Sequence, residues 1–127
     1  MEAELPEPFD SQYREIIKKF SQMKDTYGYY DDGRLPQDNA FVVEILKFLI
    51  GVLDHMEISF DKLDLEQWAL FLNSMPEEFN YGDPEQNYLE LEGIDLVAIL
   101  LKFDEEPTIL QISTIRKKLE KALPRFS

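Results

Sequence analysis

Apolar residues recur at helical spacing in five segments of the chain, and turn-forming residues separate these segments. Spacings of three and four residues place side chains on one face of a helix. In residues 10–25 this face consists of Tyr13, Ile16, Ile17, Phe20 and Met23. Asp10 or Ser11 is the expected N-cap of the helix. Residues 1–9 are acidic and contain proline, and we expect a flexible lead-in with little to bury.

Residues 38–56 form the most apolar of the predicted helices. Apolar residues extend around most of its circumference, as is typical of a helix buried on several sides. They are Phe41, Val42, Val43, Ile45, Leu46, Phe48, Leu49, Ile50, Val52 and Leu53. A membrane span needs about 20 mostly apolar residues. The largely apolar stretch, residues 40–53, is shorter than this and contains Glu44 and Lys47. We therefore expect the central helix of a core and no membrane span.

Capping patterns delimit the later helices. Asp64 with Gln67 resembles a capping box, although this helix could begin at Asp61, and it ends before Pro76. Thr108 with Gln111 forms a second capping box, for a helix that ends at Pro124.

The segment between these two helices has two interpretations. Asp83 followed by Pro84 predicts a helix over residues 84–103. Gly93 weakens this prediction, and residues 88–91, which begin at Tyr88 and end at Leu91, could instead form a short strand before a helix that starts at Gly93. In both cases residues 1–127 predict an all-α, single-domain bundle of about five helices.

The charge of the chain is unevenly distributed. The chain has 26 acidic and 13 basic side chains and a net charge of -13. Residues 54–106 hold 15 acids and 2 bases, whereas residues 107–127 hold 1 acid and 5 bases. The late basic residues suit a helix C-terminus and could neutralise part of the acidic middle. The net charge disfavours direct binding to nucleic acid or to an anionic membrane.

The chemical inventory argues against an enzyme. The chain has no cysteine, which excludes thiol chemistry and fits the cytoplasm, as does an N-terminus without a secretory signal. The single histidine, His55, lies at a helix end, where a cation is favoured without any catalytic role. The sequence contains neither a Gly-rich phosphate loop nor a nucleophile elbow. We therefore expect a non-enzymatic protein without a cofactor.

One fragment supports an alternative hypothesis. Glu92 and Asp95 lie three residues apart in LELEGIDLVAILL, and on a helix such a pair can hold Mg²⁺. The fragment resembles one metal motif of the all-α MazG-like nucleotide pyrophosphohydrolases, over about a tenth of the chain. This resemblance implies metal-dependent cleavage of a nucleotide triphosphate, with Glu92 and Asp95 as ligands. The family's second, Glu-rich motif is matched here only by Glu44, with Lys47 where another carboxylate would be needed.

Two loops combine tyrosines with carboxylates. Tyrosine is frequent at interface hot spots, and nearby carboxylates steer a basic partner toward the surface. The expected partner-binding residues are Tyr29, Tyr30, Asp31 and Asp32 in the first loop, and Glu77, Glu78, Tyr81, Asp83 and Glu85 in the second. Phe79 and Tyr88 belong to the same second loop.

These loops predict a binding module for a basic protein. Size and charge are typical of an immunity or inhibitor protein that neutralises a basic toxin or nuclease. An acidic adaptor and a structural subunit, including a homo-oligomer, stay open as alternatives.

Overall fold

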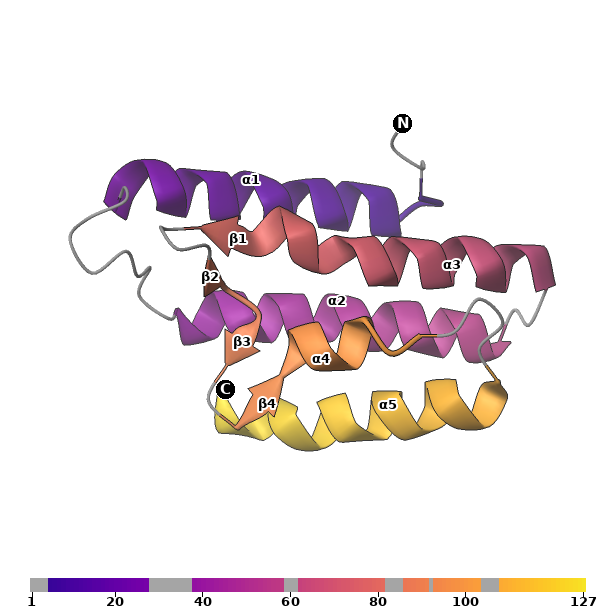
Figure 1. Cartoon of the computed structure of the whole chain (residues 1–127). Coiled ribbons are helices and arrows are strands. Elements are labelled where there is room, and N and C mark those ends of the chain that lie inside the picture. Colours follow the sequence, from indigo (N-terminus) through magenta and orange to yellow (C-terminus); the bar gives the residue numbers. More distant parts are fainter. Residues whose placement is uncertain (1–4, 28–37, 59–61, 82–85, 92, 104–107) are drawn as a thin grey trace.

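The structure is a computed structural model of the 127-residue chain, and it describes residues 5–27, 38–58, 62–81, 86–91, 93–103 and 108–127. Helices dominate these ranges, which confirms the predicted all-α fold (Figure 1). The helical elements are α1 (Phe9–Tyr27), α2 (Asn39–Ile58), α3 (Lys62–Ser74), the 3-10 helix η1 (Met75–Phe79), α4 (Leu96–Leu100), α5 (Ile109–Ala122) and the 3-10 helix η2 (Leu123–Arg125). Within the described ranges, no helix is long and apolar enough to cross a membrane.

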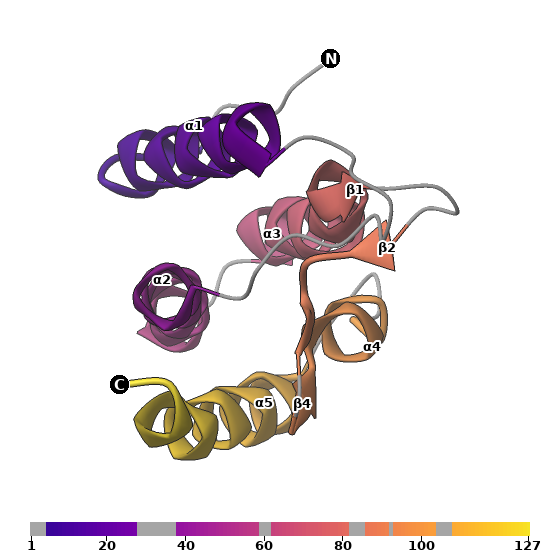
Figure 2. The same cartoon turned by 90° about the vertical axis from the view of Figure 1, so that its left-hand side faces the viewer.

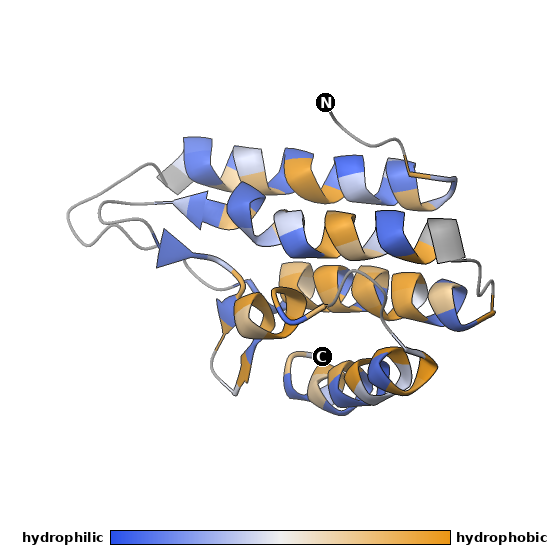
Figure 3. Ribbon diagram, turned by 45° about the vertical axis from the view of Figure 1, so that its right-hand side comes forward, coloured by the Kyte–Doolittle hydropathy of each residue, from blue (hydrophilic) through white to orange (hydrophobic). Residues whose placement is uncertain are grey.

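The helix α2 is at the centre of the fold, as its apolar circumference predicts. Figures 1 and 2 show α1 and α3 on one side of α2 and α5 on the opposite side. Apolar residues surround most of this helix (Figure 3). Its buried residues are Phe41, Val42, Ile45, Leu46, Phe48, Leu49, Val52, Leu53 and Met56. Contacts on several sides explain why α2 lacks the single polar face of a surface helix.

Residues that precede the predicted start of α1 already contact the core. The helix begins at Phe9, ahead of the predicted N-cap, and Leu5 and Phe9 both pack against the core. The Phe9 ring lies 5.5 Å from that of Trp68 and 6.4 Å from that of Phe48, in edge-to-face geometry. The expectation that residues 1–9 have little to bury is therefore wrong for Leu5 and Phe9. Phe9 lies four residues before Tyr13 and continues the stripe, but the prediction of Asp10 or Ser11 as the N-cap excludes it from the helix. Leu5 lies in a proline-containing segment without helical spacing.

Two small strand pairs replace most of the helix predicted over residues 84–103. β1 (Asn80–Tyr81) pairs antiparallel with β2 (Gln86–Asn87), and β3 (Glu90–Leu91) pairs antiparallel with β4 (Ile94–Asp95). The helix prediction is wrong for the described residues before Leu96, and α4 also ends at Leu100, short of residue 103. The alternative of a short strand within residues 88–91 is confirmed, but the helix after it starts at Leu96 and not at Gly93. The partner of β3 follows it directly in sequence. Gly93, with a φ of +95°, lies between the two strands in a conformation that disfavours residues with a side chain.

Helix caps were predicted with mixed success. Thr108 caps α5, because its hydroxyl accepts a hydrogen bond from the Gln111 backbone N at 3.1 Å. The Gln111 side chain does not complete the box but donates to the Lys102 carbonyl at 3.2 Å, which links α4 to α5. The prediction of Asp64 as a cap is wrong because α3 already begins at Lys62, which agrees with the alternative of an earlier start near residue 61.

Candidate functional site

An acidic face follows the outer side of α3 and continues onto η1. We define the acidic strip as Glu66, Leu70, Ser74, Glu77 and Glu78, all of which are exposed. Glu66, Leu70 and Ser74 are four residues apart and therefore share one helix face. Because η1 follows α3 without a break, Glu77 and Glu78 extend this surface. Leu70 is 69% exposed and supplies a large apolar side chain within the strip.

Two predicted binding residues adjoin the core at the end of the strip. Tyr81 in β1 is half-buried and packs against the core, so that only part of its ring is available to a partner. Glu78 accepts a hydrogen bond from the Tyr13 hydroxyl on α1. Of these three predicted residues, which are neighbours in the sequence, Glu77 and Glu78 are exposed, Glu78 is already engaged and Tyr81 is half-buried.

Phe79 and Tyr88 are core residues and not parts of a recognition loop. The Phe79 side chain is fully buried against the Phe20 ring, with ring centroids 5.0 Å apart. Tyr88 is 4% exposed, and its hydroxyl accepts a hydrogen bond from the Asp38 backbone N at 2.9 Å. Burial raises the pKa of Tyr88. Aromatic content alone could not separate these two residues from exposed ones, because core and interface both favour aromatic side chains.

The remaining predicted binding residues lie outside the described ranges. They are Tyr29, Tyr30, Asp31 and Asp32 of the first loop, and Asp83 and Glu85 of the second.

The geometry proposed for a Mg²⁺ pair is wrong at Asp95. This residue ends β4, and its side chain accepts a hydrogen bond from the Ala98 backbone N at 3.1 Å as the N-cap of α4. The helix therefore begins after Asp95 and does not place it on a helical face shared with residue 92. Glu92 itself lies outside the described residues. Among the residues described, no group of three or more His, Cys, Asp or Glu is arranged to hold a metal ion.

His55 contributes to packing at the end of α2. Its ring centroid lies 5.3 Å from that of Phe9 and 5.8 Å from that of Trp68. This half-buried position between aromatic rings gives the histidine a structural role.

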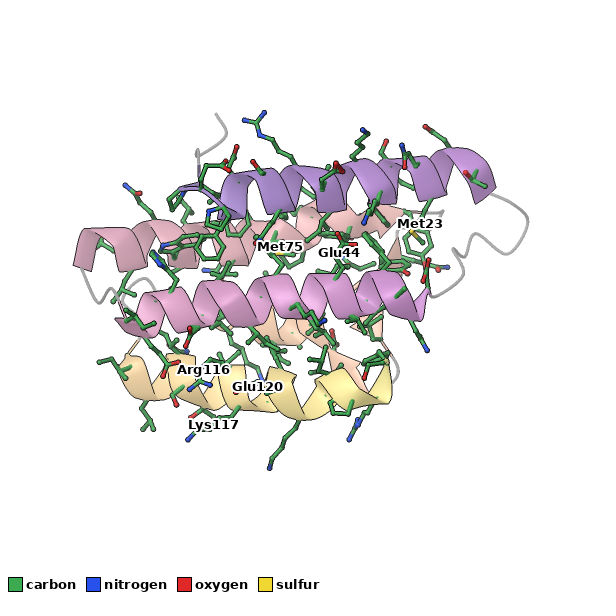
Figure 4. The ribbon with its side chains drawn as sticks, turned by 180° about the vertical axis from the view of Figure 1, so that it is seen from behind. Met23, Glu44, Met75, Arg116, Lys117 and Glu120 are labelled. Carbon is green, nitrogen blue, oxygen red and sulfur yellow. The ribbon has the colours of Figure 1, made fainter. Side chains whose placement is uncertain are left out.

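A cleft of about 410 Å³ lies between α1 and the start of α2. The Lys19 ammonium on α1 reaches Glu44 on α2, with 2.8 Å between Nζ and Oε2. The hydrogen bond to Glu44 raises the pKa of Lys19. Figure 4 shows Glu44 in the space between these two helices. The two charges neutralise each other, so this cleft offers no net charge to a ligand through this pair.

A second groove, of about 400 Å³, is basic and was missed by the sequence analysis. We define the basic groove by its cationic residues Lys102, Lys118, Lys121 and Arg125, which line it together with Asp95. Its apolar wall consists of Ile94, Ala98, Ile99 and Ala122. Lys102 and Arg125 are far apart in the sequence, and only the folding of the chain brings them to one groove.

Arg116 connects the basic C-terminal helix to the acidic middle of the chain. Its guanidinium pairs with Glu57 at the end of α2, and its Nη1 lies 2.7 Å from Glu120 Oε1. These carboxylates, Glu57 first, raise the pKa of Arg116. Figure 4 shows Arg116 and Glu120 together on α5, whereas Lys117 points away from α2. Internal neutralisation by the basic helix is thus seen at Arg116.

The fold and these surfaces define a small all-α protein with an acidic strip on α3 and η1 and a basic groove beside α4 and α5. No family model matches the chain, and neither a curated protein nor a solved structure matches it.

Proposed function

We propose that the protein is a non-enzymatic binding module that uses the acidic strip to bind a basic partner protein, as an inhibitor or immunity protein of a basic toxin or nuclease. The observation that carries this proposal is the exposed Leu70 within a row of carboxylates on α3 and η1. Exposed large apolar residues surrounded by polar ones are typical of protein-binding surfaces.

Two carboxylates of the strip, those of Glu66 and Glu77, are exposed and available to a partner. Among the described residues, neither Glu66 nor Glu77 takes part in an ion pair. The whole chain has a net charge of -13, which adds a long-range attraction for any basic surface. Such complementarity raises the association rate more than it slows dissociation. Leu70 supplies the apolar contact that would hold the complex once it has formed.

A nuclease is a suitable partner on chemical grounds. Enzymes that bind a polyphosphate chain gather lysine and arginine at the substrate site. A row of carboxylates can occupy such a site in place of the phosphates, which blocks the substrate without any catalytic group in the inhibitor. This fits a chain whose only histidine is packed between aromatic rings.

A pull-down from the source lysate, followed by a salt titration of the recovered complex, tests the proposal. We expect a basic partner whose affinity falls steeply between low and physiological salt, because charged surface contacts are screened. A toxin or nuclease encoded in the neighbouring reading frame would identify the candidate partner directly. Recovery of no basic partner, together with salt-insensitive binding of any other protein, would refute the proposal.

Matched variants locate the binding face. The Glu66→Gln, Glu77→Gln double variant should slow association by roughly three- to tenfold, because rim charges act mainly on the association rate. Glu15→Gln with Glu90→Gln removes the same charge from exposed positions on α1 and β3 and should have a smaller effect. Equal slowing by both pairs would show that only the net charge matters, and would reject the strip as the binding face.

The apolar contact needs its own variant. Leu70→Ala should accelerate dissociation by about fivefold or more, because a central apolar contact contributes on the order of 1 kcal/mol. Since Leu70 is exposed in the free protein, this substitution should leave the unfolding midpoint nearly unchanged. Unchanged dissociation would place the apolar contact elsewhere.

A further inference from the structure

The basic groove gathers cations from two directions. Lys118 and Lys121 are three residues apart on α5, and Arg125 follows four residues later, so that all three lie on one side of this segment. Lys102, just after α4, lines the same groove. Helix-dipole matching accounts for a lysine in the last turn of α5, but it does not account for Lys102, which belongs to another element.

The three lysines of the groove are not neutralised by described carboxylates. Lys102, Lys118 and Lys121 form no ion pair within the described ranges, in contrast to Arg116 on the same helix. Among the described residues that line the groove, Asp95 is the one carboxylate, and it is already engaged as the N-cap of α4. Within the described part of the chain, four cations against this carboxylate make a positive site on a protein of net charge -13.

Arg125 is held in place by the turn of the hairpin. Its Nη1 donates a hydrogen bond to the Gly93 carbonyl at 3.0 Å. A Cβ at residue 93 would lie 2.7 Å from this same nitrogen, so a larger residue there would displace the guanidinium from this position. The bond uses one of the five N–H donors of the guanidinium. Fixing the side chain in advance lowers the entropy that a ligand would otherwise have to offset.

We propose that the basic groove binds a small organic phosphate ester. A phosphate monoester has about two negative charges at neutral pH and three strong acceptor oxygens, which suits several separate cationic donors. A carboxylate has one charge and two oxygens. The volume of about 400 Å³ falls within the range of small-molecule sites. The apolar wall, which includes Ile94 and Ile99, would contact the organic part of the ester.

The binding of defined probes to the full chain tests this proposal. Isothermal calorimetry at low salt would use inorganic phosphate, glucose 6-phosphate, AMP and citrate. We expect saturable 1:1 binding of at least one ester, and weaker binding of inorganic phosphate because it lacks a part that contacts the apolar wall. In a two-dimensional NMR spectrum, addition of the ester should shift the amide signals of Gly93, Ala98 and Ala122.

A matched pair of variants distinguishes the groove from general charge effects. Lys118→Gln with Lys121→Gln should weaken ester binding by about tenfold, because it removes two of the four cations that line the groove. The control is Lys47→Gln with Lys117→Gln, which removes the same charge from two exposed positions that do not line the groove. All of these side chains are exposed, so the variants should fold.

Several outcomes would overturn the proposal. These are the absence of saturable binding by either ester, binding of citrate alone, and equal weakening by the control variant Lys47→Gln with Lys117→Gln. Ester binding that is lost only in the Lys118 and Lys121 variant would support it.

Discussion

Replacing the buried Tyr88 in two ways separates the contribution of its ring from that of its hydroxyl. Tyr88→Phe keeps the ring, whose centroid lies 5.5 Å from that of Phe20 and 5.7 Å from that of Phe41. It removes only the hydrogen bond that the hydroxyl accepts from the Asp38 backbone N. Tyr88→Ala removes the ring as well and leaves a cavity in the core.

The structure sets the size of each effect. A hydrogen bond contributes about 0.5–1.5 kcal/mol to stability. Asp38 is exposed, so water can replace the lost acceptor, and we expect a loss near 0.5–1 kcal/mol for Tyr88→Phe. Since Tyr88 is only 4% exposed, Tyr88→Ala should cost about 3–5 kcal/mol, as for other large aromatic truncations.

Urea unfolding followed by far-UV circular dichroism measures both values. Tyr88→Phe should move the midpoint slightly at an unchanged slope, whereas Tyr88→Ala should move it by several times as much. Neither variant is expected to alter the binding face directly. If Tyr88→Ala lost less than about 1 kcal/mol, the ring would not be part of the core and the interior position of Tyr88 would be refuted.

Three further predictions concern other contacts. Burial raises the pKa of Tyr88 above its usual value of about 10, so the stability that comes from the neutral hydroxyl is complete below pH 10 and is lost as the pH rises further. The free energy of unfolding in urea should therefore fall more steeply above pH 10 for the wild type than for Tyr88→Phe. A double-mutant cycle with Glu57→Gln and Arg116→Gln should give a coupling energy near 1 kcal/mol, which is high for a surface ion pair because both side chains are about four-fifths buried. A coupling energy near zero would contradict the ion pair. Gly93→Ala should lower stability by about 1–2 kcal/mol, because alanine is strained at a φ of +95°, and a neutral effect in thermal unfolding would contradict this conformation.

Long apolar stripes made most of the fold predictable. The helix α2 was recognised as central because its apolar residues cover several faces, which only contacts on several sides can satisfy. The start of α5 was predicted at Thr108 because a local hydrogen bond to the Gln111 backbone defines it. Both signals depend on residues that are close in sequence.

The segment between η1 and α5 was not predictable in the same way. Strands of two residues are too short to show a periodicity, and their positions depend on hydrogen bonds between neighbouring segments that the apolar pattern does not reveal, such as that from Tyr88 N to the Phe79 carbonyl at 2.9 Å. Pro84 after Asp83 favoured a helix on local grounds, and the pairing of β3 with β4 prevailed over this preference.

The two candidate surfaces differ in how much the sequence could indicate. Glu77 and Glu78 are adjacent and lie beside a proline, so their exposure was expected from composition. The basic groove depends on Lys102 and Arg125, whose proximity is a result of tertiary packing. No spacing rule relates two residues on different elements, so the groove could be found only in the folded chain.

The central position of α2 has a consequence for the order in which the chain can fold during synthesis. Its most extensive contact is with α5, which is made only after α3 and both strand pairs have been synthesised. Until then an almost fully apolar helix lacks its main partner, and the emerging chain is exposed to aggregation or to capture by chaperones. In the completed protein, the same dependence means that the amides at the middle of α2 should exchange with solvent only when the whole fold opens.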